Sequence, residues 1–134
     1  MKKNNGQPGT LAGEWFLIGS EELKFAESAF QELNAFYSQI CFQCQQAVEK
    51  YLKGFLVSSG KSFPKIHDLV ELVQLCAKRN KDFSKFLDDA GILSQYYITT
   101  RYPVEYPPAA RKQAAEAIKI AQEIISFVKT IRCA

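Results

Sequence analysis

The stretch "YSQICFQCQQAVEKYLKGFLVSSG", residues 37–60, contains the clearest structural signal in the chain. Its apolar side chains recur every three or four residues, which is the spacing of one face of an α-helix. Gly60 follows the last of them, at the position where a helix C′ residue is expected. We therefore predict a helix over residues 37–59. Its buried face is predicted to consist of Ile40, Cys44, Val48, Tyr51 and Phe55.

The same spacing recurs on both sides of this segment. Residues 14–33 predict a first helix that starts at Ser20 or earlier, near Trp15. After a short loop, His67 and Asp68 open another helix, because aspartate is a good N-cap. This helix is predicted to run to about Arg79.

Two more helices are predicted beyond residue 80. Asp82 can cap a helix that ends near Thr99 and buries Phe86, Ala90, Leu93 and Tyr97. Pro108 suits the first position of the last helix. That helix carries an apolar seam at Ala110, Ala114, Ala117, Ala121, Ile124, Val128 and Ile131. The predicted fold is all-α, an up-and-down antiparallel bundle of about five helices.

Length and composition favour one domain. The chain has 134 residues, enough to bury a core. Its apolar runs, such as residues 15–18, are far shorter than the roughly 18 residues that span a membrane. Residues 1–13 contain no long apolar run and are expected to be a flexible tail, followed by a domain over 14–134. Four cysteines without a secretion signal favour reduced thiols and a cytoplasmic location.

The pair Cys41 and Cys44 has the spacing that begins some zinc sites and redox pairs. A structural zinc site needs four ligands, usually with a second close pair, whereas the other cysteines are single, at 76 and 133. We therefore interpret both thiols as buried apolar fillers and expect neither a metal nor a cofactor.

A polar line also runs along residues 37–59, one turn apart, and consists of Gln45, Gln46, Glu49 and Lys53. Glu49 and Lys53 have the favourable i,i+4 order of an exposed ion pair. A solvated face is the simpler interpretation, and glutamines that bond across a subunit or to a base are the alternative. For the only histidine, His67, a structural role at the helix start is favoured over a role as a base.

The stretch "ITTRYPVEYPP", residues 98–108, interrupts the helical pattern with three prolines. Arg101 lies in this loop, and two further cations, Arg111 and Lys112, fall in the first turn of the last helix. Cations beside a helix N-terminus suit a phosphate or carboxylate, and Tyr102 and Tyr106 suit stacking on a base. These five residues form the predicted nucleotide- or anion-binding site. The alternative is an Arg101–Glu105 ion pair with both tyrosines packed on the bundle.

Four segments in order resemble the HEPN domain, the higher eukaryotes and prokaryotes nucleotide-binding domain. They are "FQCQQAVEKYLKGFL", "IHDLVELV", "YYITTRYP" and the alanine-rich last helix, and the likeness covers residues 14–131. The resemblance implies a helical bundle that forms a homodimer with a cleft between its subunits. Small prokaryotic members are commonly encoded beside a minimal nucleotidyltransferase, in pairs that resemble toxin and antitoxin. Other members are metal-independent ribonucleases that use an arginine followed, after four to six residues, by a histidine.

Arg101 matches this arginine, but the histidine has no match. The corresponding positions are Tyr106, Pro107 and Pro108, and none of them replaces imidazole near neutral pH. The resemblance therefore implies a nucleotide- or RNA-binding module that lacks the catalytic histidine and acts with a nucleotidyltransferase partner. The alternatives are an Arg101-dependent endoribonuclease toxin and a purely structural docking partner of a nucleotidyltransferase.

Overall fold

The computed structural model describes residues 5–7, 9–62, 64–102 and 105–132. The described part of the chain is all-α, as predicted, with five α-helices, one 3₁₀ helix and no strand. These are α1 (Leu11–Glu32), α2 (Tyr37–Ser58), α3 (Leu69–Ala77), the 3₁₀ helix η1 (Lys81–Phe86), α4 (Leu87–Thr99) and α5 (Arg111–Arg132). Within it, no helix is both long and apolar enough to pass through a bilayer.

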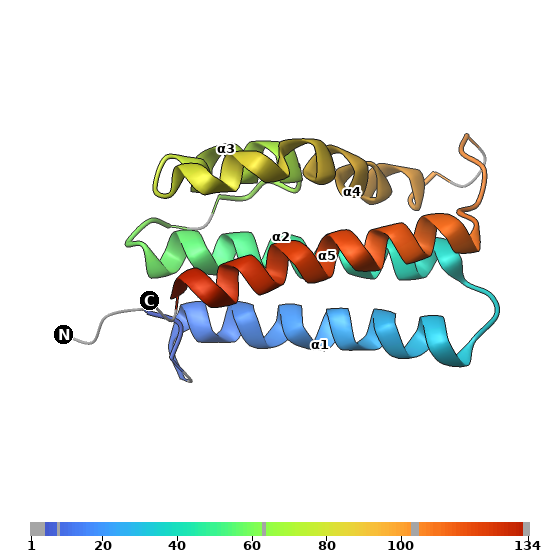
Figure 1. Cartoon of the computed structure of the whole chain (residues 1–134), viewed down its shortest axis with the longest axis horizontal. Coiled ribbons are helices and arrows are strands. Elements are labelled where there is room, and N and C mark those ends of the chain that lie inside the picture. Colours follow the sequence, from blue (N-terminus) through green and yellow to red (C-terminus); the bar gives the residue numbers. More distant parts are fainter. Residues whose placement is uncertain (1–4, 8, 63, 103–104, 133–134) are drawn as a thin grey trace.

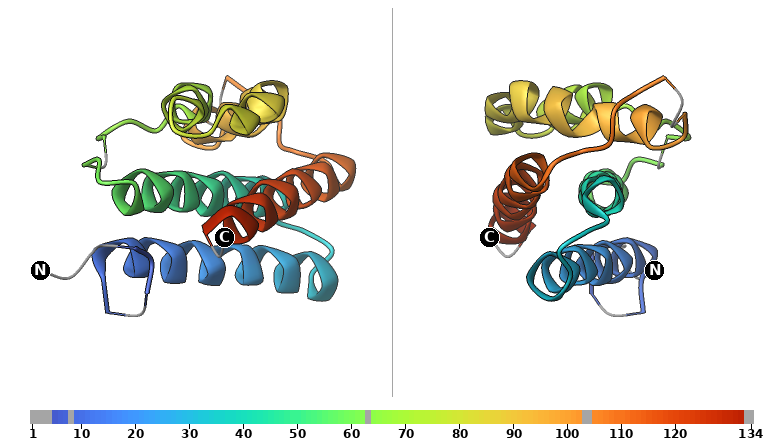
Figure 2. Two further views of the ribbon diagram at one scale, coloured as in Figure 1. Left: turned by 60° about the vertical axis from the view of Figure 1, so that its left-hand side comes forward. Right: turned by 90° about the vertical axis from the view of Figure 1, so that its right-hand side faces the viewer.

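The helices lie in three layers. α2 and α5 form the middle layer, with α1 on one side and the α3–α4 pair on the other (Figures 1 and 2). Because α1, α3, α4 and α5 all pack against α2, this helix is covered on nearly every side. The predicted seam of α5 is buried from Ala114 to Val128, whereas Ala110 is exposed because it precedes the helix.

α1 and α2 approach each other closely through glycine. A Cβ atom on Gly19 of α1 would lie 2.7 Å from a ring carbon of Tyr51, and one on Gly54 of α2 would lie 2.7 Å from a ring carbon of Phe16. Neither position has room for a side chain without movement of an aromatic ring. The two rings pack against each other, with centroids 5.1 Å apart.

Predicted helix starts differ from the observed ones in three places. α1 begins at Leu11, because the Thr10 side chain accepts a hydrogen bond from the Gly13 N–H. Asn80, not Asp82, provides the next cap, and it caps η1, so that α4 starts only at Leu87.

α5 starts at Arg111 instead of Pro108. Before the helix begins, the Ala109 N–H donates to the Ser38 hydroxyl at the start of α2 (2.8 Å). The Ala110 N–H donates to the side-chain oxygen of Gln113 (2.7 Å). The first bond ties the end of the loop to α2, the second joins Ala110 to the first turn of α5, and the helix begins after both donors.

The turn between α1 and α2 contains a backbone exception. Phe36 precedes α2 with a φ of 62°, in the left-handed region, and its side chain is 66% exposed. The other described residues with a positive φ are glycines. One of them is Gly60, which ends α2 as predicted and lets the Lys61 N–H bond to the Leu56 carbonyl (2.9 Å).

Candidate functional site

Arg101 lies just beyond the end of α4 and is exposed. Its backbone N–H donates to the Ile98 carbonyl (3.0 Å), which continues the chain for one more turn. This turn places the guanidinium carbon of Arg101 4.8 Å from the centroid of the Tyr97 ring. None of the ion pairs among the described residues joins Arg101 to Glu105. The guanidinium therefore rests on an aromatic ring with its N–H groups not neutralised by that carboxylate.

The Tyr97 ring also stacks on His67, the residue before the N-cap of α3. The ring centroids are 4.3 Å apart and the planes differ by 15°. Tyr97 was predicted to be buried, which is wrong: Tyr96 takes the buried position and Tyr97 is only partly covered. As a result, the Tyr97 ring contacts both Arg101 and the only histidine of the chain.

His67 is held in place by a buried carboxylate. Its Nδ1 lies 3.0 Å from Oε2 of Glu49, which also accepts a bond from Lys53 Nζ at 3.1 Å. Gln45 donates to the other carboxylate oxygen of Glu49 at 3.1 Å and to the His67 carbonyl at 3.2 Å. A carboxylate of this kind only accepts hydrogen bonds, so Nδ1 of His67 carries a proton and Nε2 remains for other partners.

The polar line on α2 is thus not a solvated face, and that prediction is wrong. Glu49 is 3% exposed, Lys53 5% and Gln45 0%. The physical reason is the central position of α2. Gln45 and Glu49 contact His67, just before α3, and Lys53 lies over the Trp15 ring of α1. The Oε1 atom of Gln45 is buried without a hydrogen-bond partner among the described residues. His67 forms the outer edge of this cluster, with 46% of its side chain exposed.

The two arginines of the predicted site contact different parts of the bundle. Arg111 packs on Phe30, its guanidinium carbon 4.3 Å from the ring centroid, and donates to the Tyr37 hydroxyl (3.4 Å). It therefore lies at the turn between α1 and α2, beside the exposed Lys112. Arg101 instead lies against Tyr97 on α4.

The two loop tyrosines face solvent to different degrees. Tyr102 is 53% exposed and Tyr106 is 38% exposed. Tyr106 lines a hollow of about 290 Å³ between the start of α2, the end of α4 and the start of α5. Both tyrosines are thus on the surface, and Tyr102 directly follows Arg101 in the chain. Sequence periodicity did not point to Tyr97 or Glu49 as members of this site.

The predicted burial of Cys41 and Cys44 is confirmed. Burial raises the pKa of the Cys41 thiol to about 11 and raises the pKa of Cys44 as well. Both side chains are therefore protonated near neutral pH and are poor nucleophiles and poor metal ligands. The described residues contain no group of three or more potential metal ligands. Cys133 lies outside the described residues.

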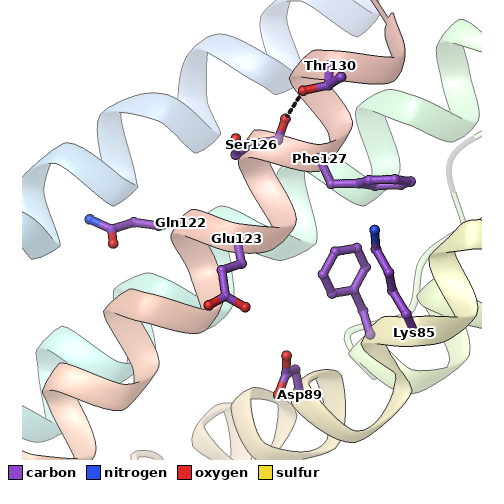
Figure 3. Close-up of a pocket in the computed structure, with 8 residues that line it drawn as sticks. Lys85, Asp89, Gln122, Glu123, Ser126, Phe127 and Thr130 are labelled. Carbon is purple, nitrogen blue, oxygen red and sulfur yellow. Dashed lines mark hydrogen bonds between the residues drawn. The ribbon is translucent and has the colours of Figure 1, made fainter.

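A larger hollow, about 710 Å³, lies elsewhere, between the η1–α4 junction and α5 (Figure 3). Lys85 lies over its aromatic wall, with Nζ 4.5 Å from the centroid of the Phe127 ring. The carboxylates of Asp89 and Glu123 point toward the same space. A groove with two carboxylates is a poor site for an anion, which leaves Arg101 and its neighbours as the better candidate.

Comparisons with known proteins agree with this fold. The family model of the HEPN domain matches residues 12–131. The crystal structure of TT1696 from Thermus thermophilus is 30% identical, with a TM-score of 0.74, and the match covers 89% of this chain and 96% of that one. ST0689, an archaeal HEPN homologue, is 28% identical with a TM-score of 0.70, covering 90% of this chain and 97% of that one. The search of curated proteins found no match. The family model spans nearly the whole chain, and the protein belongs to the HEPN domain family.

Proposed function

We propose that this protein is a nucleotide- or RNA-binding module that holds a phosphate group at Arg101. The observation that carries the proposal is the exposed guanidinium of Arg101 on Tyr97, beside His67. Arginine binds phosphate through several N–H donors. Stacking on a ring already restricts the side chain, so less conformational entropy is lost when phosphate binds. Tyr102, next in the chain and half exposed, offers a ring on which a base can stack.

The proposed working form is a homodimer that acts beside a minimal nucleotidyltransferase, in a pair of the toxin and antitoxin type. Support for the partner comes from the family alone. Support for the dimer includes an exposed apolar stripe on α1, where Leu11, Ile18 and Phe25 are 44%, 46% and 59% exposed. These residues are seven apart and therefore share one helix face.

The test of phosphate binding is a titration of the wild type and Arg101→Ala with nucleotides and short single-stranded RNA, by fluorescence anisotropy. A hydrogen bond to a charged group contributes about 1.5–3 kcal/mol. We therefore expect Arg101→Ala to weaken binding by roughly ten- to a hundredfold. Arg79→Ala, at an exposed arginine beyond α3, is the matched control and should bind like the wild type. Equal affinity in all three proteins would reject Arg101 as the anchor.

A metal-independent endoribonuclease is the second candidate, and one observation favours it. His67 is oriented by a buried carboxylate and shares the Tyr97 ring with Arg101. An imidazole whose Nδ1 is held by a carboxylate presents Nε2 as a proton acceptor, so the group that residues 106–108 lack is present in another part of the chain. RNA incubated with the protein in EDTA tests this: cleavage lost in both Arg101→Ala and His67→Gln supports the enzyme, and intact RNA with the wild type rejects it.

A further inference from the structure

We propose that His67 is a second phosphate ligand beside Arg101, and that phosphate binding at this site takes up a proton on its Nε2 atom. The inference rests on the proposed function and assigns to it an additional binding residue and a pH dependence. The Tyr97 ring contacts both residues. Its centroid lies 4.8 Å from the guanidinium carbon of Arg101 and 4.3 Å from the centroid of the His67 ring.

The orientation of His67 makes Nε2 the atom that a ligand meets. Nδ1 is occupied by Glu49 at 3.0 Å, and the side chain is 46% exposed. No described residue forms a hydrogen bond with Nε2. When neutral, this nitrogen is an acceptor and repels a phosphate oxygen; when protonated, it is a donor. A phosphate bound at Arg101 that also contacts His67 therefore selects the protonated imidazole.

The charged groups around His67 also favour proton uptake on phosphate binding. Glu49 favours the imidazolium, but Lys53 already neutralises this carboxylate at 3.1 Å. Asp68 is engaged at the N-cap of α3, where it accepts a bond from the Val70 N–H (2.9 Å). Arg101, on the shared Tyr97 ring, repels a protonated His67 while the site is empty. A phosphate that contacts both side chains offsets this repulsion and makes proton uptake more favourable.

Binding should consequently be tighter at lower pH. Proton uptake on binding means that the bound state holds more protons than the free state, so affinity rises with proton concentration. Each unit by which the ligand raises the histidine pKa allows a tenfold gain in affinity. We expect roughly a tenfold tighter Kd at pH 6 than at pH 8.

The experiment uses a probe that itself does not titrate or react. A short 2′-O-methyl RNA with hydroxyl groups at both ends has only phosphodiester charges and cannot be cleaved through its 2′ position. Its Kd is measured by fluorescence anisotropy at pH 6, 7 and 8 and constant ionic strength. The wild type and the control Arg79→Ala should show the tenfold trend, and His67→Gln should bind with less than a twofold change. Because His67 is the only histidine, no other imidazole contributes to the trend.

An NMR titration of the same residue makes the inference independent of how well His67→Gln folds. The single histidine of the wild type gives one set of ring signals, whose midpoint should move to higher pH when the oligonucleotide is present. An unmoved midpoint overturns the inference, as does a pH trend that persists in folded His67→Gln. If wild-type affinity is independent of pH but Arg101→Ala still weakens binding, His67 is not a ligand and the proposed function stands. If the wild type does not bind the probe at any pH, both fail.

Discussion

Glu49 is the residue on which the candidate site depends. Its carboxylate is 3% exposed and is the acceptor for Lys53, Gln45 and His67. A buried charge of this kind is tolerated only when its partners offset the loss of hydration. Glu49 therefore links the stability of α2 to the orientation of His67.

Removing Lys53 should be costly, because it leaves Glu49 charged and buried with fewer donors. We expect Lys53→Ala to lower the free energy of unfolding by about 3–5 kcal/mol, measured by urea denaturation. The matched control is Lys50→Ala, one turn earlier, whose ion pair with Glu22 (3.3 Å) lies nearer the surface. Partly exposed pairs of this kind contribute about 0–1 kcal/mol. Similar losses in the two variants would contradict the assignment of Glu49 and Lys53 as a buried pair.

Sequence patterns predicted this ion pair but not its burial, for a clear reason. Glu49 and Lys53 have the i,i+4 order that is usual on solvated helix faces, and nothing in the local sequence of α2 shows that other helices cover it. The stack of Tyr97 on His67 joins α4 to the segment before α3, and such non-local contacts leave no trace in helical periodicity. By contrast, Arg101 and its exposed position at a forced helix end were predictable from the prolines and the family motif.

Among the helices, α1 and α2 pack closely at glycine residues. At Gly19 a Cβ atom would lie 3.0 Å from the backbone oxygen of Ala47, in addition to its contact with Tyr51. Backbone atoms of a packed helix cannot move aside as the end of a flexible side chain can. Glycine at this position therefore determines how closely the two helices pack.

This packing can be tested with one methyl group. Gly19→Ala should lower the free energy of unfolding by about 1–2 kcal/mol, because overpacking outweighs the better helix propensity of alanine. Gly91→Ala in α4 is the control, since its Cβ atom would meet only Val70, at 3.8 Å. That variant should gain up to about 1 kcal/mol. Thermal or urea unfolding measures both, and a stabilised Gly19→Ala would contradict the close contact.

Helix periods were predictable, and helix starts were less so. The buried seam of α5 and the cap of α3 at Asp68 follow from spacing and capping preferences, which are local. The start of α5 at Arg111 depends on the hydrogen bond from Ala109 to Ser38, which is 71 residues away in sequence. Proline at 108 permits a helix start there, but a tertiary contact selects the later one.

In the whole molecule, α1 is the outer layer on one side of the middle pair (Figure 2). Its inner face packs on α2 and α5, while Ile18 and Phe25 line a shallow hollow of about 370 Å³ beside Gln43 of α2. Apolar side chains at one edge of an outer helix lose contact with water when a second molecule covers them. This surface is where we place the proposed homodimer contact.

A charge within that surface should prevent the proposed dimer from forming. We expect the wild type to sediment as a dimer and Phe25→Glu as a folded monomer, with dimerisation weakened at least tenfold, because a buried unpaired carboxylate costs more than about 1.4 kcal/mol. Leu17→Glu is the control: Leu17 is 61% exposed but is turned by about 100° around the helix from Ile18. A monomeric wild type, or equal effects of the two substitutions, would reject this surface.

Phe36 has a left-handed backbone conformation, which strains the turn between α1 and α2. A side chain with a Cβ atom in this conformation costs roughly 1–2 kcal/mol, which glycine would avoid. Phe36 recovers little of that cost through packing, since its side chain is 66% exposed. The turn between α1 and α2 thus lowers the stability of the fold, whereas the contacts within the bundle raise it. The stability of the isolated chain therefore gives no reason for an aromatic residue at this position. A partner that covered the Phe36 ring would give one.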